Sequence, residues 1–128
     1  MSTVNELVDL YIAGWNETNA DRRKTLIART WTEDATYVDE HRNSKGHGEI
    51  DAMIAVVQER FPGYKFRLAG KVEGHNGRVR FTWEIGGTEE APLHIVGTDF
   101  GFVAEDGRLK SITGFLDVIP QELLQMAS

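Results

Sequence analysis

The sequence has 128 residues, of which 41% are hydrophobic and 27% are charged, both close to the averages of globular domains. This length predicts a single domain spanning residues 1–128. The formal net charge of −6 disfavours nucleic-acid and anionic-membrane partners, because those surfaces are themselves negative. Without cysteine, disulfides and thiolate chemistry are excluded. The sequence shows no targeting segment and no membrane-spanning run, so we expect a cytoplasmic protein.

Helical periodicity dominates the first half of the sequence. Apolar side chains recur at the spacing of one helical face over residues 4–15, which predicts an amphipathic helix. A second helix is expected over residues 19–31, followed by a short strand over residues 35–38. The polar segment 40–48 has the composition of a loop, and the helical period returns over residues 50–61. We therefore expect three helices, with one strand between the second and the third.

The second half changes to the period of two that is typical of strands with one buried face. His75-Asn76-Gly77 and Asp106-Gly107 are strong hairpin signals. The order helix-helix-strand-helix followed by four antiparallel strands indicates an α+β fold. The four strands are predicted over residues 64–68, 79–85, 93–103 and 109–118, with a short tail over residues 121–128.

Three segments carry a resemblance to a known family: Tyr11-Ile12 in the first helix, Trp31 to Asp39 entering the first strand, and Gly46-His47-Gly48 before the third helix. With the order of elements, they resemble the NTF2-like superfamily, in particular its SnoaL-like and ketosteroid-isomerase-like branch. The resemblance implies a cone, in which three N-terminal helices pack on a curved, mostly antiparallel sheet around an apolar pocket. It leaves the function open, because isomerases, cyclases, dehydratases, epoxide hydrolases and non-catalytic modules share this fold.

Tyr11, Asp39 and Asp99 are the candidate catalytic residues. Helical periodicity directs Tyr11 inward, and strand alternation does the same for Asp99. By resemblance, Tyr11 matches the oxyanion tyrosine of ketosteroid isomerases, Asp39 their general base, and Asp99 a second oxyanion donor that its apolar site keeps protonated. Such a set can divide proton abstraction and oxyanion stabilisation without a metal or an organic cofactor.

Each of these residues also has a purely structural interpretation. Tyr11 can be a core tyrosine whose hydroxyl bonds a backbone carbonyl, and Asp39 can be a strand-end aspartate that hydrogen-bonds the following loop. Asp99 can form a buried ion pair with Arg67 or Arg80, although strand alternation puts both arginines on the other face. If no cation reaches Asp99, burial should raise its pKa and favour the protonated form, which donates a hydrogen bond.

Large apolar side chains from several elements form the predicted pocket wall: Trp15, Trp31, Phe61, Trp83, Ile85, Ile112 and Leu116. The alternative is that they fill the core and leave no cavity. Three tryptophans in so small a domain favour a cavity for a flat apolar ligand. On the other face of the 93–103 strand, Val96, Phe100 and Phe102 predict a homodimer through the outer face of the sheet.

No metal or cofactor site is predicted. The stretch from Asp39 to Glu49 is rich in histidine and carboxylate side chains, but its irregular spacing is typical of a solvated loop. The sequence contains no phosphate-binding loop, no nucleophile elbow and no dinucleotide-binding fingerprint.

The leading hypothesis is a cofactor-independent isomerase, lyase or cyclase acting on a small apolar carbonyl compound. Asp39 removes a proton beside the carbonyl group, while Tyr11 and protonated Asp99 stabilise the enolate that forms. The reaction can then end in isomerisation, cyclisation or dehydration. Two alternatives stay open: a non-catalytic module that binds a small apolar molecule or dimerises, and an accessory subunit whose outer sheet docks another protein.

Overall fold

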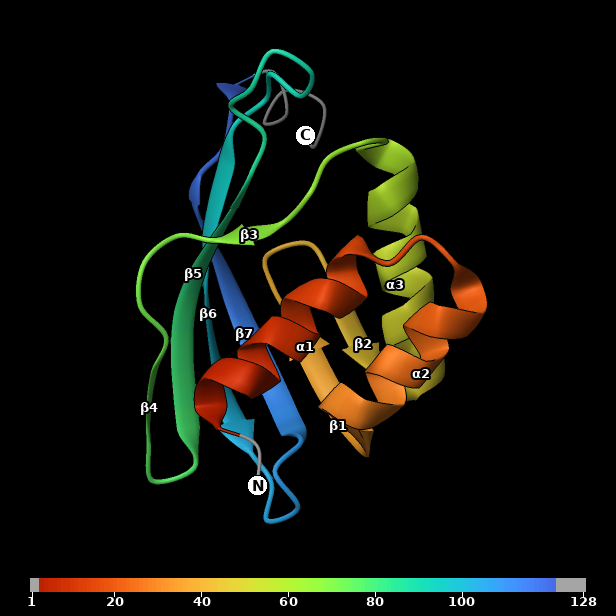
Figure 1. Ribbon diagram of the computed structural model, residues 1–128, viewed down its shortest axis with the longest axis vertical. Coiled ribbons are helices and arrows are strands. Elements are labelled where there is room, and N and C mark those ends of the chain that lie inside the picture. Colours follow the sequence, from red (N-terminus) through yellow and green to blue (C-terminus); the bar gives the residue numbers. More distant parts are fainter. Residues whose placement is uncertain (1–2, 122–128) are drawn as a thin grey trace.

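The computed structural model describes residues 3–121 and shows helices packed on the concave side of one curved sheet (Figure 1). The helices are α1 (Val4–Asn16), α2 (Ala20–Thr30) and α3 (Gly46–Arg60). The strands are β1 (Trp31–Val38), β2 (Asn43–Lys45), β3 (Arg67–Leu68), β4 (Glu73–His75), β5 (Arg78–Ile85), β6 (Ile95–Val103) and β7 (Leu109–Val118).

The sheet is open and mixed. Its strand order is β2-β1-β7-β6-β5-β3, with β4 also paired to β5. Only the β1–β7 pair is parallel among these described strands, and the other pairs are antiparallel. The α+β class and the curved, mostly antiparallel sheet are therefore confirmed. The predicted tail over residues 121–128 lies, after its first residue, outside the described residues.

The core lies between the three helices and the concave face of the sheet. Leu7, Val8, Tyr11 and Trp15 are buried on one stripe of α1, as the helical spacing predicts. The Tyr11 ring packs edge-on against Phe81 of β5, with 5.1 Å between the ring centroids. No helix among residues 3–121 combines the length and the apolar character that crossing a bilayer requires.

The hairpin signal at His75-Asn76-Gly77 is confirmed, but the partner strand differs from the prediction. Asn76 and Gly77 have φ angles of 48° and 75°, the left-handed pair that a two-residue type I′ turn requires. This turn joins β5 to the short strand β4. The sequence does not predict β4, since its residues are all exposed and show no alternation.

The predicted strand over residues 64–68 is reduced to Arg67–Leu68 in the structure. Asn16, the last residue of α1, explains this shortening. Its side-chain oxygen accepts the Phe66 N–H at 2.7 Å, and its amide group donates to the Phe66 carbonyl at 2.9 Å. The Phe66 backbone is therefore bonded to a helix end instead of to a neighbouring strand.

The segment 40–48, predicted as a loop, contains β2 and the start of α3. The Asp39 N–H donates to the Arg42 carbonyl at 3.0 Å, which closes a tight turn and returns the chain alongside β1. Strand β1 in turn begins at Trp31 instead of residue 35, and its register against β7 shifts between Trp31 and Thr36. The polar residues that broke the sequence period lie in this irregular stretch.

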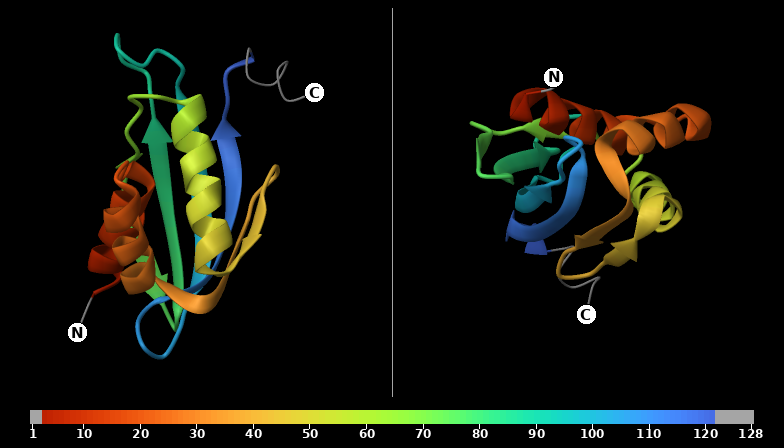
Figure 2. Two further views of the ribbon diagram at one scale, coloured as in Figure 1. Left: turned by 90° about the vertical axis from the view of Figure 1, so that its right-hand side faces the viewer. Right: turned by 90° about the horizontal axis from the view of Figure 1, so that it is seen from below.

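All three described helices lie on one side of the sheet (Figure 2). Strands β5, β6 and β7 turn their other face away from the helices. On that face Phe100, Phe102 and Phe115 keep 39%, 40% and 60% of their surface exposed. The molecule therefore has one face that encloses a cavity and another that presents aromatic side chains to solvent.

Candidate active site

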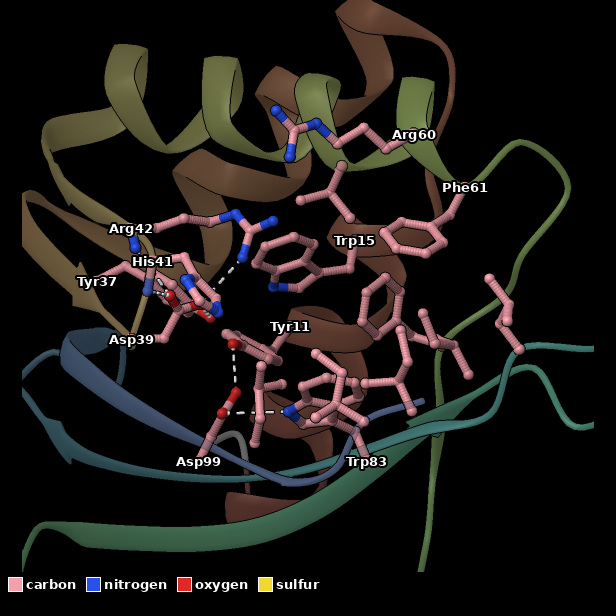
Figure 3. A pocket seen from close by; sticks show the side chains of 17 residues that line it. Tyr11, Trp15, Tyr37, Asp39, His41, Arg42, Arg60, Phe61, Trp83 and Asp99 are labelled. Carbon is pink, nitrogen blue, oxygen red and sulfur yellow. Dashed lines mark hydrogen bonds and ion pairs between the residues drawn. The ribbon is translucent and has the colours of Figure 1, made fainter. Parts of the chain in front are cut away.

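A cavity of about 720 Å³ lies between the concave sheet face, α1 and α3. This volume falls in the range of ligand-binding sites for small organic molecules. Figure 3 shows its side chains converging from α1, α3 and the sheet. The lining consists of Tyr11, Trp15, Tyr37, Asp39, His41, Arg42, Val57, Arg60, Phe61, Phe66, Trp83, Ile85, Leu93, Ile95, Asp99, Leu116 and Ile119.

The structure places five of the seven predicted wall residues in this lining and two outside it. Trp15, Phe61, Trp83, Ile85 and Leu116 line the cavity. Trp31 and Ile112 do not, and this part of the prediction is wrong. Trp31 packs on Tyr11 with ring centroids 5.6 Å apart, and Ile112 lies against Gly101; both are buried in the core cluster. These two side chains therefore belong to the core and not to the cavity wall.

Tyr11 and Asp99 meet at the cavity wall. The Tyr11 hydroxyl donates to Asp99 Oδ2 at 2.6 Å, and the Trp83 indole N–H donates to Asp99 Oδ1 at 3.1 Å (Figure 3). Asp99 is 1% exposed, so both oxygens are bonded within the protein interior. These three side chains come from α1, β5 and β6, and together they present a tyrosine hydroxyl and a carboxyl group at one point.

The alternative of an ion pair for Asp99 is excluded. Arg67 Nε pairs with Glu84 at 3.0 Å and Arg80 pairs with Glu73 at 2.7 Å, both on the outer face of the sheet. Burial therefore dominates, and it raises the Asp99 pKa to about 6 against the lowering effect of the Tyr11 and Trp83 hydrogen bonds. Burial also raises the pKa of Tyr11 well above 10, and the nearby Asp99 charge adds to this.

Two glycines make room for this arrangement. Gly97 faces Trp83 across the β5–β6 pair, and a Cβ atom at Gly97 would lie 2.3 Å from the indole ring. Gly114 faces Asp99 across the β6–β7 pair, and its Cβ atom would lie 2.7 Å from Asp99 Oδ1. A mid-strand glycine often marks such a close approach. In the sequence, Gly97 and Gly114 therefore mark positions where a side chain from the neighbouring strand lies over the backbone.

Asp39 lines the same cavity but is strongly bonded to its own loop. Its Oδ1 accepts the N–H groups of His41 and Arg42 at 2.8 and 2.9 Å. Its Oδ2 accepts the Tyr37 hydroxyl at 2.7 Å and lies 3.5 Å from the Arg42 guanidinium. The structural interpretation of Asp39 as a strand-end aspartate is therefore confirmed by its contacts, and its role as a base remains a prediction.

Tyr37 connects the two polar clusters. Alternation along β1 puts its side chain on the same face as Asp39, and its hydroxyl lies 3.4 Å from where a Gly114 Cβ would be, beside Asp99. Burial, together with the charges of Asp99 and Asp39, raises the Tyr37 pKa well above 10. Tyr37 therefore stays protonated and serves as a hydrogen-bond donor within the site.

Comparison with known proteins identifies the family. No protein-family model matches this sequence, and no curated protein matches it. Among solved structures, a provisionally named isomerase of the SnoaL-like family from Agrobacterium tumefaciens is 35% identical, with 92% of this chain and 100% of that chain covered and a TM-score of 0.85. The chain belongs to the SnoaL-like family.

More distant SnoaL-like and NTF2-like structures share the fold. A provisionally named SnoaL-like polyketide cyclase from Jannaschia sp. CCS1 is 16% identical, covering 99% of this chain and 93% of its own at a TM-score of 0.70. An NTF2-like protein of unknown function from Cytophaga hutchinsonii is 17% identical, covering 97% and 96% at a TM-score of 0.67. The cone predicted by resemblance is thereby confirmed.

Several residues that line the cavity of this SnoaL-like protein are not predicted from the sequence. His41, Arg42 and Arg60 come from a turn and a helix end, whose side-chain directions no periodic pattern fixes. Tyr37 could have been found, because it shares strand parity with Asp39. The His/carboxylate-rich stretch that begins at Asp39 disperses in the fold, and the described residues contain no group of three such side chains that could hold a metal ion.

Proposed function

We propose that this SnoaL-like protein is a cofactor-independent acid–base enzyme acting on a small apolar carbonyl compound. Tyr11 and protonated Asp99 donate hydrogen bonds to the substrate carbonyl oxygen. Asp39 removes a proton from the adjacent carbon, the C–H electron pair forms the new C=C bond, and the C=O π pair moves onto that oxygen, giving an enolate. Return of the proton to a different atom of the enolate gives isomerisation. Attack of the enolate carbon on a second carbonyl group of the substrate gives cyclisation, and loss of a hydroxyl group as water gives dehydration.

The observation that carries this proposal is the 2.6 Å contact between the Tyr11 hydroxyl and Asp99 Oδ2 at the cavity wall. Two donors this close can both bond one ligand oxygen, with heavy-atom distances near the usual ~2.7 Å. Both groups are buried, so hydrogen bonds to a developing oxyanion act in a medium of low dielectric constant. The apolar remainder of the lining suits a substrate with a hydrophobic body.

The protonation state of Asp99 decides whether it can donate a hydrogen bond to the substrate oxygen. When ionised, Asp99 accepts the hydrogen bond of the Tyr11 hydroxyl, and neither group is then available as a donor to a ligand oxygen. When protonated, it becomes a donor itself and frees the Tyr11 hydroxyl. With a pKa of about 6, Asp99 exchanges its proton close to neutral pH. A bound apolar substrate would displace water from the cavity and favour the protonated form further.

A specific observation favours a second candidate function, a non-catalytic module that binds a small apolar molecule. The Asp39 carboxylate already accepts three hydrogen bonds no longer than 2.9 Å from the protein, so its oxygen lone pairs are engaged by the loop and by Tyr37 instead of facing a ligand proton. The same cavity without a competent base would bind a ligand and leave it unchanged.

Solvent deuterium exchange separates the two functions. With 2-tetralone as the probe, the enzyme should accelerate exchange of the protons beside the carbonyl. We expect Asp39→Asn to reduce the acceleration about 100-fold and Tyr11→Phe at least about 10-fold. Asp9→Asn, on the exposed side of α1, is the control that should leave exchange unchanged. Binding of 2-tetralone without accelerated exchange, or exchange insensitive to Asp39→Asn, would favour the non-catalytic module.

The partner expected for the outer sheet face is a second copy of the chain. Phe100 and Phe102 of β6 pack edge-on at 5.4 Å, and Phe115 projects from the neighbouring strand β7 on the same face. The described helices all lie on the opposite side of the sheet (Figure 2). Contiguous exposed aromatic side chains favour burial against a like surface. A homodimer through this face is therefore part of the proposal.

A further inference from the structure

Two arginines line the cavity without a part in the proposed chemistry. Arg42 lies in the turn between β1 and β2, and Arg60 is the last residue of α3. Figure 3 shows both guanidinium groups extending over the cavity, on the same side of the Trp15 indole. We refer to Arg42 and Arg60 as the cationic rim.

The cationic rim lacks the close carboxylate partners that five other arginines of this protein have. Ion pairs of 2.6 to 3.3 Å are present at Arg22, Arg23, Arg67, Arg80 and Arg108. Arg42 reaches Asp39 only at 3.5 Å, through one of its terminal nitrogens. No ion pair or hydrogen bond joins the Arg60 guanidinium to any residue between positions 3 and 121.

Among the arginines of residues 3–121 that have no ion pair shorter than 3.5 Å, only Arg42 and Arg60 line the cavity. Two of the described acidic groups line the cavity, and only Asp39 approaches the rim, through its 3.5 Å contact with Arg42. Asp99 is buried against Tyr11 and Trp83, and Asp39 is held by its loop amides and Tyr37. Guanidinium groups at the edge of an apolar cavity are well suited to bind the carboxylate of a ligand.

The wall between the rim and the Tyr11–Asp99 pair is aromatic. Trp15 and Phe66 have ring centroids 5.2 Å apart, and Phe66 and Trp83 are also 5.2 Å apart. These rings form a continuous apolar surface from α1 to β5. A flat ring system lying on this surface would have one end near Tyr11 and Asp99 and another near the rim.

From this arrangement we infer that the ligand is an organic acid: a planar apolar ring system with a carbonyl or hydroxyl oxygen at Tyr11 and Asp99, and a carboxylate bound by Arg42 and Arg60. The inference rests on the proposed function in one respect, namely that the cavity binds a small apolar molecule. The inference adds a carboxylate to that molecule, and it therefore predicts that the cavity binds acids more tightly than their neutral analogues.

Matched acid and amide probes test the inference by calorimetry. The probes are 6-hydroxy-2-naphthoic acid and 6-hydroxy-2-naphthamide, with 4-hydroxybenzoic acid and 4-hydroxybenzamide as a smaller pair. We expect each acid to bind about tenfold or more tightly than its amide at pH 7.5 and low salt, since the arginine contacts are charge-assisted. The preference should shrink as the salt concentration rises.

The variant Arg42→Gln/Arg60→Gln should abolish the preference for the acids while leaving amide binding within about twofold. Arg29→Gln, in the last turn of α2 and outside the lining, is the control and should keep the preference. Thermal unfolding of the double variant verifies that it is folded.

The outcomes distinguish the two proposals. Equal binding of acids and amides, or a preference that survives the double variant, overturns the inference but leaves the ligand-binding cavity intact. If neither probe pair binds at millimolar concentration, the cavity does not accept planar ligands, and the proposed function fails together with the inference.

Discussion

The Trp83 indole lies across Gly97, its partner on the adjacent strand, and a Cβ atom at position 97 would come within 2.3 Å of the ring. This close approach lets the indole N–H reach Asp99, two residues further along β6. Gly97 is therefore part of what holds the Asp99 carboxyl group in place, although it has no side chain of its own.

Gly97→Ala should displace the indole and remove its hydrogen bond to Asp99. We expect the free energy of unfolding to fall by about 1–3 kcal/mol from overpacking, and the tryptophan fluorescence spectrum to shift. Gly48→Ala is the matched control, because a Cβ atom there meets nothing within 4 Å. Equal stability of the two variants in urea unfolding would show that Trp83 moves away without cost.

Asp99 should make the protein less stable as pH rises. Its pKa is near 3.8 in the unfolded chain and about 6 in the folded protein, so the folded state binds more protons between these values. The free energy of unfolding therefore falls from about pH 4 to pH 6, and the loss reaches about 3 kcal/mol above pH 6.

Asp99→Asn removes this titration and keeps the shape of the neutral acid. Its stability relative to the natural protein should therefore increase by about 3 kcal/mol between pH 4 and pH 8 in urea unfolding. Comparing the two proteins at each pH cancels the contributions of the other carboxyl groups. A difference that does not change with pH would mean that Asp99 does not titrate in this range.

The rate of proton exchange should depend on pH through the titration of Asp99. Because protonated Asp99 is the donor in the proposed mechanism, exchange into 2-tetralone should decline above an apparent pKa of about 6. Asn at position 99 also donates through its amide, so Asp99→Asn should retain activity within about tenfold and lose this decline. A rate that rises through pH 6 in the natural protein would instead assign ionised Asp99 as the base.

Arg23 should be a structural residue with no part in the cavity. It is 5% exposed, pairs with Asp51 at 2.6 Å and donates to Gln58 and to the Glu17 carbonyl, which joins α2 to α3 and the end of α1. Arg23→Met should lower the free energy of unfolding by about 3 kcal/mol, since Asp51 loses its partner.

The neighbouring variant Arg22→Met provides the control for this effect. Arg22 is 71% exposed and pairs with Glu17 at 3.3 Å, so its removal should cost less than about 1 kcal/mol. Chemical denaturation measures both variants. Similar losses for the two would contradict a special role for the buried arginine.

The outer aromatic face should hold the dimer together. Phe115→Ser removes a ring that is 60% exposed in the single chain, so it should weaken dimerisation while changing the stability of the chain by less than about 0.5 kcal/mol. Val56→Ser, exposed on α3, is the control and should leave the dimer unchanged. Sedimentation equilibrium measures both, and a monomeric natural protein at high concentration would refute the dimer.

Local periodicity in the sequence determined the direction of several side chains and the bounds of several elements. The stripe on α1 placed Tyr11 inside, and alternation along β6 placed Asp99 on the cavity face, because a helix and a strand fix side-chain direction residue by residue. The boundaries of β7 and the Asn76-Gly77 turn also followed from local pattern and turn chemistry.

Only the tertiary structure decided which of these side chains meet. The Phe66 backbone is bonded by Asn16, 50 positions away, which no local propensity could predict. Trp31 and Ile112 are as apolar as the true wall residues, and only tertiary packing puts them in the core. Arg42 and Arg60 reach the cavity from a turn and a helix end, where direction depends on packing and not on period.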